Sequence, residues 1–200
     1  MKTKADVAII GCGEAGIFAG YELKKLHPEL DIVVVEQGKD IYSRKCPIVA
    51  GKVKSCVHCK TCDTMCGFGG AGAFSDGKFN FTTQFGGWLT DYMEPAEVMN
   101  LIEYVDSINV AHGATIERYS TSEARALEIE ALKYDLHLLQ AQCKHLGTER
   151  NLQILTNIYE SQRDKVDYRF NVSVEKIEQL DDGYRLITDQ GDVDCTYLVA

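Results

Sequence analysis

The chain has 200 residues, of which 45% are hydrophobic and 26% are charged, and its formal net charge is −9. This composition is typical of a folded chain with a substantial core and argues against intrinsic disorder. Because no basic tail offsets the negative charge, we expect neither nucleic acid nor an anionic membrane as the main partner. The apolar run at residues 7–10 is far shorter than a signal-peptide core or a membrane span, which predicts a cytoplasmic protein.

The first predicted elements are a strand, a helix and a second strand. Residues 5–10, Ala-Asp-Val-Ala-Ile-Ile, predict a buried strand because apolar side chains dominate the run. Apolar side chains at helical spacing predict a helix that ends before Pro28, and residues 31–36, Asp-Ile-Val-Val-Val-Glu, predict the next strand. Together they predict a βαβ unit of the Rossmann type.

The turn between the first strand and the helix is rich in glycine; it consists of Gly11, Cys12, Gly13, Glu14, Ala15 and Gly16. Gly11 permits a tight turn, Gly13 lets the backbone approach a pyrophosphate, and Gly16 allows the helix to pack closely on the strand. Glu36 ends the second strand, where a carboxylate can accept hydrogen bonds from both hydroxyls of an adenosine ribose and repels the 2′-phosphate of NADP. The unit therefore predicts dinucleotide binding, and it is equally compatible with FAD and NAD.

Four cysteines follow with the spacing C-x2-C-x2-C-x3-C; they are Cys56, Cys59, Cys62 and Cys66. The spacing matches the ferredoxin run for a [4Fe-4S] cluster, and Cys46, which precedes a proline, would supply the remote ligand and leave Cys66 spare. Tetrahedral zinc is a second hypothesis for the same thiolates. A redox disulfide between Cys56 and Cys59 is a third, and plain reduced thiols are the fourth.

Residues 67–87 are rich in both glycine and phenylalanine. Seven of the 17 glycines fall in this segment, and they bring bare backbone amides close to a neighbouring group. Five phenylalanines in the same segment make it too apolar for a solvated linker. We therefore expect it to form a wall of a cofactor pocket.

The middle of the chain predicts part of a separate domain. Helices are expected from Pro95 to a stop at Gly113, over residues 121–135, and over residues 148–163. In the last helix we expect three side chains to face inward, namely Leu152, Leu155 and Tyr159. Residues 136–143 are compatible with either strand or helix. We interpret the region as part of an inserted α+β cap or substrate domain.

His145 is the best candidate for a catalytic acid or base. A lone histidine in such a segment is more often structural, so the catalytic residues stay unassigned. After it, residues 172–178, 184–189 and 192–200 predict a three-stranded β-meander with turns between the strands. The expected organisation is a cofactor domain in residues 1–90, the cap in 91–165, and a return to the cofactor domain in 166–200.

These motifs together resemble a family, the bacterial FAD-dependent dehydrogenases related to glutathione-reductase-like flavoproteins. The matching segments are the turn at residues 11–16, Glu36-Gln37-Gly38, Cys46-Pro47, the cysteine run, residues 67–78 and His145-Leu146-Gly147-Thr148. The resemblance implies extended FAD, with Glu36 on the ribose and a four-residue loop near the flavin: Gly69, Gly70, Ala71 and Gly72. Gln37, Ser75 and Lys78 lie in matching segments and join the predicted cofactor residues. It also implies a longer protein, of which this chain would be an N-terminal fragment.

The expected function is that of an FAD-dependent oxidoreductase. Hydride would pass through the flavin, with NAD(P)H as a candidate electron donor, and the expected partner is a small-molecule substrate or an electron carrier. Two alternatives stay open. One is an NAD-binding dehydrogenase domain, and the other is a non-catalytic module that binds FAD and metal and senses redox state.

Overall fold

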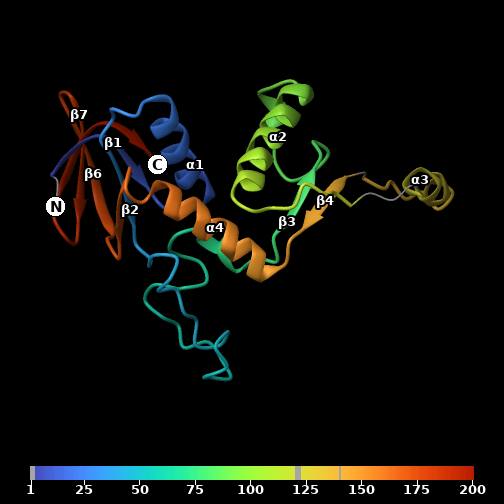
Figure 1. Cartoon of the computed structure of the whole chain (residues 1–200), viewed down its shortest axis with the longest axis horizontal. Coiled ribbons are helices and arrows are strands. Elements are labelled where there is room, and N and C mark those ends of the chain that lie inside the picture. The colour runs from blue at the N-terminus through green and yellow to red at the C-terminus, as the bar shows by residue number, and fades with distance from the viewer. Residues whose placement is uncertain (1–2, 120–122, 140) are drawn as a thin grey trace. The chain divides into compact units, whose positions relative to one another are not determined.

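The computed structural model describes residues 3–119, 123–139 and 141–200, and its main feature is a six-stranded sheet (Figure 1). In spatial order the strands are β5 (Asp167–Phe170), β2 (Ile32–Glu36), β1 (Lys4–Ile10), β8 (Val193–Val199), β7 (Gly183–Thr188) and β6 (Val174–Leu180). The first four are parallel, and β8, β7 and β6 form an antiparallel meander. The predicted α/β fold with a parallel sheet and a β-meander is confirmed.

The core of the sheet follows from the apolar runs of the two first strands. All five residues of β2 are buried, and Val34 and Ile9 are at most 1% exposed. Helix α1 (Glu14–Leu26) packs on this sheet through Ile17, which is also 1% exposed. Full burial of such a side chain contributes about 1.5–3 kcal/mol, so these residues anchor the start of the chain.

The chain divides into two compact units, which are Met1–Phe74 with Leu155–Ala200, and Ser75–Ile154. The sheet and α1 belong to the first unit. Within the first unit, Phe68 is fully buried. Its ring contacts the rings of Tyr159 and Tyr168 edge-on, with 4.9 and 5.6 Å between the ring centroids. These aromatic contacts join α4 (Thr148–Gln162) and β5 to the segment that carries Phe68.

The second unit contains the helices α2 (Pro95–Ala111) and α3 (Ala124–Leu132), the 3-10 turn η2 (Leu89–Asp91), and an antiparallel pair of strands, β3 (Lys78–Phe81) and β4 (Gln142–His145). Pro95 opens α2 behind a capping box, in which Glu94 and Glu97 satisfy each other's backbone amides. Gly113, with φ +110°, follows its end. The predicted helix from Pro95 to Gly113 is confirmed.

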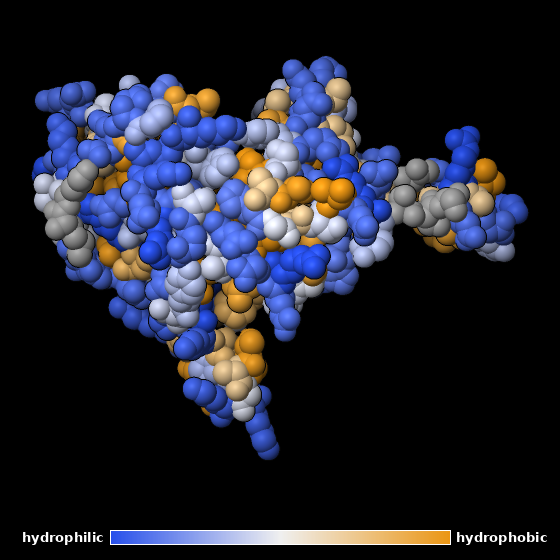
Figure 2. Space-filling model, in the orientation of Figure 1, coloured by the Kyte–Doolittle hydropathy of each residue, from blue (hydrophilic) through white to orange (hydrophobic). Residues whose placement is uncertain are grey.

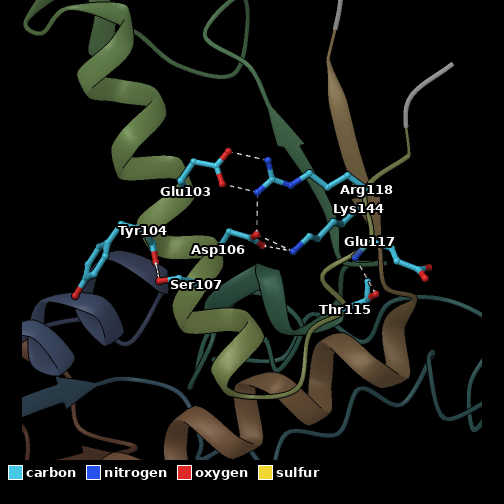
Figure 3. Close-up of polar contacts among 8 residues, drawn as sticks. All are labelled: Glu103, Tyr104, Asp106, Ser107, Thr115, Glu117, Arg118 and Lys144. Atoms are coloured by element: carbon cyan, nitrogen blue, oxygen red, sulfur yellow. Dashed lines mark hydrogen bonds and ion pairs between the residues drawn. The ribbon is translucent and has the colours of Figure 1, made fainter. Parts of the chain in front are cut away.

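A charged network ties α2 to β4 (Figure 3). The side chain of Lys144 is 1% exposed, and its ammonium lies 2.7 Å from both carboxylate oxygens of Asp106. Arg118 pairs with Glu103 and Asp106, and its guanidinium lies 3.6 Å from the centre of the Phe81 ring. The buried ammonium is thus neutralised by a carboxylate of the helix.

Helix α3 is shorter than the segment 121–135 expected from the sequence, and the first two residues of that segment lie outside the described residues. Leu127, Ile129 and Leu132 are at least half exposed, and hydrophobic side chains reach the surface there (Figure 2). Residues 136–139 form no regular element, and strand begins only at Gln142. Helix α3 therefore gains little burial within its own unit.

The predicted inward face of α4 is partly wrong. Leu155 is buried as expected, but Leu152 is 41% exposed, and Ile154 and Ile158 are the nearly fully buried residues instead. The buried face of α4 is therefore shifted by one residue from the expected face, because burial depends on which segments pack against the helix.

A membrane span needs a long apolar helix, and no helix in the described ranges has both the length and the hydrophobicity for one.

Candidate functional site

The glycine-rich turn lies where β1 ends and α1 begins. Gly11 has φ +93°, which only glycine adopts without strain. A Cβ at Gly16 would lie 2.1 Å from the carbonyl oxygen of Gly11, so the helix approaches the turn too closely for any side chain. A Cβ at Gly13 would have no heavy atom within 4 Å, so the backbone there borders open space. The turn therefore leaves the amino end of α1, with its free amides, accessible to an anionic group.

Glu36 joins three backbone segments around this turn. The residue is 6% exposed; Oε2 of its carboxylate accepts a hydrogen bond from the amide of Cys12 at 2.7 Å, and Oε1 accepts hydrogen bonds from the amides of Gly38 and Gly67 at 2.7 and 2.9 Å. A carboxylate has about four acceptor sites, so about one remains for a further donor. The spacing predicted a carboxylate at this place, but it did not indicate that most of its acceptors are used by the protein.

The second glycine segment packs directly on the first. The amide of Gly69 donates to the carbonyl oxygen of Cys12 at 2.8 Å. A Cβ at Gly70 would lie 3.3 Å from the Cα of Gly13, and one at Gly72 would lie 2.5 Å from a carboxylate oxygen of Glu14. The structure thus brings together the turn and the loop that includes Ala71, two segments far apart in the sequence.

Arg44 binds backbone carbonyl groups of the second glycine segment. Its guanidinium donates to the carbonyl oxygens of Phe68, Gly70 and Asp63 at 2.6, 2.7 and 2.9 Å, and it lies over the ring of Phe74. The residue is 7% exposed, and this burial lowers the pKa of the guanidinium. Sequence reasoning missed Arg44, because an isolated arginine after a strand carries no spacing signal for contacts with distant carbonyl groups.

Three further predicted cofactor residues of the first unit are exposed, namely Glu14, Ala15 and Gln37. Glu14 and Ala15 form the first turn of α1. Partial desolvation raises the pKa of the Glu14 carboxyl. The side-chain amide of Gln37 donates to the sulfur of Cys66 at 3.3 Å, so Gln37 faces the cysteine run.

The cysteine run does not converge on one point. Within the described ranges, no group of three or more cysteine, histidine or acidic side chains is placed to hold a metal ion. Cys56 and Cys59 are exposed, whereas Cys46, Cys62 and Cys66 are partly buried. The predicted iron-sulfur or zinc ligation is therefore not shown by the described residues.

The thiols differ in their ionisation. The sulfur of Cys62 lies 3.0 Å from the hydroxyl oxygen of Thr64, and this hydrogen bond, helped by backbone amides, lowers the pKa of the Cys62 thiol. Cys12 is fully buried, and desolvation raises the pKa of its thiol well above the ordinary value. Cys62 is therefore the more reactive nucleophile of the two.

The remaining predicted residues belong to the second unit, where two segments meet. His145 pairs with Lys78 across the β3–β4 ladder, and its imidazole Nε2 lies 3.1 Å from a carboxylate oxygen of Asp76. The hydroxyl of Ser75 accepts a hydrogen bond from the side-chain amide of Asn151 at 3.4 Å. The side chains of His145 and Asp76 are more than half exposed, so their pairing is weak in water.

Comparison with solved structures identifies the fold. The chain superposes on glycine oxidase from Geobacillus kaustophilus with a TM-score of 0.53 and 16% identity, over 98% of this chain and 55% of that chain. For L-amino acid deaminase from Proteus vulgaris the TM-score is 0.48 at 12% identity, over 100% and 48% of the two chains. No protein-family model and no curated protein sequence matches. The chain shares the fold of the glycine oxidase and spans about half of its length.

Proposed function

We propose that the chain binds FAD and is the cofactor-binding part of a flavin-dependent oxidoreductase. The observation that carries this proposal is the open backbone at Gly13, at the amino end of α1 and beside a second glycine loop. The fold that the chain shares with an oxidase, over 98% of its own length, supports the proposal. The finer resemblance to bacterial FAD-dependent dehydrogenases is the reason for choosing FAD over NAD.

The residues that would hold the cofactor have separate tasks. The free amides at the start of α1 and the dipole of that helix favour a pyrophosphate, which a chain of charge −9 would otherwise repel. Glu36 would accept a hydrogen bond from about one ribose hydroxyl at its remaining acceptor site, whereas the spacing suggested hydrogen bonds from both hydroxyls. Arg44 would keep the 69–72 loop in place without contacting the cofactor.

FAD, when bound, supplies transfer of hydride or of single electrons, while the protein supplies binding and orientation. We assign no cofactor contact to Ser75 and Lys78, which belong to the second unit. A reduced nicotinamide as electron donor remains part of the proposal only through the resemblance.

The test is to measure FAD affinity, by the change in flavin fluorescence, for the unmodified chain and for the variants Gly13→Ala and Gly20→Ala. In Gly13→Ala the new methyl would meet no protein atom, so the fold should survive, but it would enter the space proposed for the pyrophosphate. Overpacking of about 1–3 kcal/mol predicts an affinity roughly 5- to 150-fold lower. The matched control is Gly20→Ala within α1, where the methyl makes only ordinary contacts and FAD affinity should be unchanged.

Two outcomes would contradict the proposal. Equal FAD affinity in Gly13→Ala and the unmodified chain would show that the pyrophosphate does not lie at this turn. Binding of NAD in place of FAD by the unmodified chain would favour the dehydrogenase-domain alternative, which the same turn supports.

A further inference from the structure

The second unit contains a cavity of about 320 Å³ that the proposed cofactor site does not use. Its walls come from β3, from the segment that follows this strand, and from α2. The volume lies near the lower end of the range for small-molecule sites, about 300–1,000 Å³. The cavity therefore has room for a small ligand.

Four polar residues of this cavity have side chains that form no bond within the described residues. Lys78 is the only charged residue among the described residues that line it. Its ammonium bonds to no residue in the described part of the chain. The same holds for three further side chains of the lining, which are the hydroxyls of Thr83 and Thr90 and the amide of Asn80. Four residues whose side chains can donate hydrogen bonds, one of them cationic, thus line one cavity.

The rest of the wall is apolar. Phe79, Phe85, Leu89 and Ile102 line the cavity, and Val98 of α2, which is 4% exposed, does so as well. Aromatic and branched side chains beside a few placed polar groups are typical of sites for small organic molecules. The ligand that fits this wall therefore carries an apolar ring or branched chain as well as an anionic group.

Two further features of the cavity concern Lys78 and the glycines Gly86 and Gly87. Lys78 faces His145 in the antiparallel ladder, and cross-strand partners of this kind have side chains close enough to interact. His145 in turn pairs with Asp76, so an acid-base group stands beside the cation. At the rim, a Cβ at Gly86 or Gly87 would meet no heavy atom within 4 Å, so the backbone there borders open space.

From these groups we infer that the cavity binds a small organic carboxylate, with the carboxylate on Lys78 and an aromatic or branched group against the phenylalanine wall. In one respect the inference rests on the proposed function: such a carboxylate would be the substrate class of the oxidoreductase. The binding itself needs no cofactor, so it can be measured on the chain without FAD.

Trp88 offers a direct signal for this measurement. It is the single tryptophan of the sequence, and both of its neighbours, Gly87 and Leu89, line the cavity. The full 200-residue chain would be titrated, at constant ionic strength, with phenylacetate, with its neutral analogue phenylacetamide, and with acetate. We expect phenylacetate to change the tryptophan emission saturably, and the two analogues to bind about tenfold more weakly or worse, since each lacks one of the two recognised groups.

A lysine pair supplies the matched variants. Lys78→Met should remove the preference for phenylacetate over phenylacetamide and should leave FAD affinity unchanged. Lys133→Met in the same unit, where the exposed lysine pairs with Glu130, should retain that preference. Equal responses to acid and amide in the unmodified chain would overturn the inference, and so would a response linear in concentration. Loss of FAD affinity in Lys78→Met would also overturn it and would return Lys78 to the cofactor site, whereas failure at Gly13 would affect the proposed function alone.

Discussion

Single residues in the glycine turn serve opposite physical purposes, although the motif presents them alike. Gly16 is required because a methyl group would collide with the Gly11 carbonyl, whereas Gly13 leaves space that the protein does not fill. The difference separates a stability effect from a binding effect. Each can therefore be tested by a single added methyl group.

Gly16→Ala should destabilise the chain, because its Cβ would lie 2.1 Å from the Gly11 oxygen and the turn must shift. The cost of such overpacking is typically about 1–3 kcal/mol, measurable as a lower urea midpoint. Gly20→Ala in the same helix should instead stabilise by up to about 1 kcal/mol, since glycine is a poor helix former. Equal midpoints for Gly16→Ala and the unmodified chain would disprove the close approach.

Cys62 should react with iodoacetamide at lower pH than an ordinary thiol. The hydrogen bond from Thr64 favours the thiolate and lowers the pKa, so the thiolate persists as the pH falls below the ordinary thiol pKa. Thr64→Val removes this bond and should move the midpoint of the rate against pH upward. The measurement is peptide mass spectrometry of pulse-labelled chain, with Cys12 as the internal control.

In that experiment the buried Cys12 thiol, whose pKa is raised, should stay unlabelled while the chain is folded. Identical pH midpoints for Cys62 in the Thr64→Val and unmodified chains would show that Thr64 does not tune the thiol. Labelling of Cys12 at the rate of Cys62 would show that the fold had opened.

The ion pair that joins helix α2 to strand β4 should govern the stability of the second unit. Asp106→Asn leaves the Lys144 ammonium buried without its carboxylate, and loss of one partner of a buried pair costs about 3–5 kcal/mol. Glu103→Gln breaks a pair whose carboxylate is 46% exposed, and it should cost only about 0–1 kcal/mol. Circular dichroism during urea unfolding would measure both, and equal effects of the two changes would contradict this account of the network.

Elements with their own boundary signals could be predicted, and those defined by distant neighbours could not. Pro95 and Gly113 mark α2 in the sequence itself, and they do so in the structure. In contrast, β3 and β5 have four residues each, too few to show a periodic pattern, and they exist because other strands pair with them. Leu152 was misplaced for a related reason, since burial on α4 depends on what covers the helix.

The candidate site divides in the same way. Its turn and Glu36 follow from local spacing, but Arg44 and its three carbonyl acceptors come from segments that only the fold brings together. The cysteine run shows the reverse case: its spacing is a strong metal signal, yet the thiols do not converge within the described residues. Spacing alone cannot fix the backbone path that would turn these thiols toward one centre.

For the whole molecule, the class of fold followed from the sequence, whereas the arrangement of the sheet did not. The βαβ unit and the terminal meander predicted an α/β protein with a parallel sheet. The place of β5 beside β2 required the structure, because most of the chain separates these strands in the sequence. The glycine-rich turn at the carboxyl end of β1 nevertheless lies where such sheets bind ligands.

The amount of flavin that the whole chain retains would show whether it binds FAD. The protein would be incubated with FAD, freed of unbound cofactor by gel filtration, denatured, and assayed for released flavin by absorbance and chromatography. We expect close to one FAD per chain, and much less for Gly13→Ala. A folded, unmodified chain that retains no FAD under these conditions would contradict the proposal.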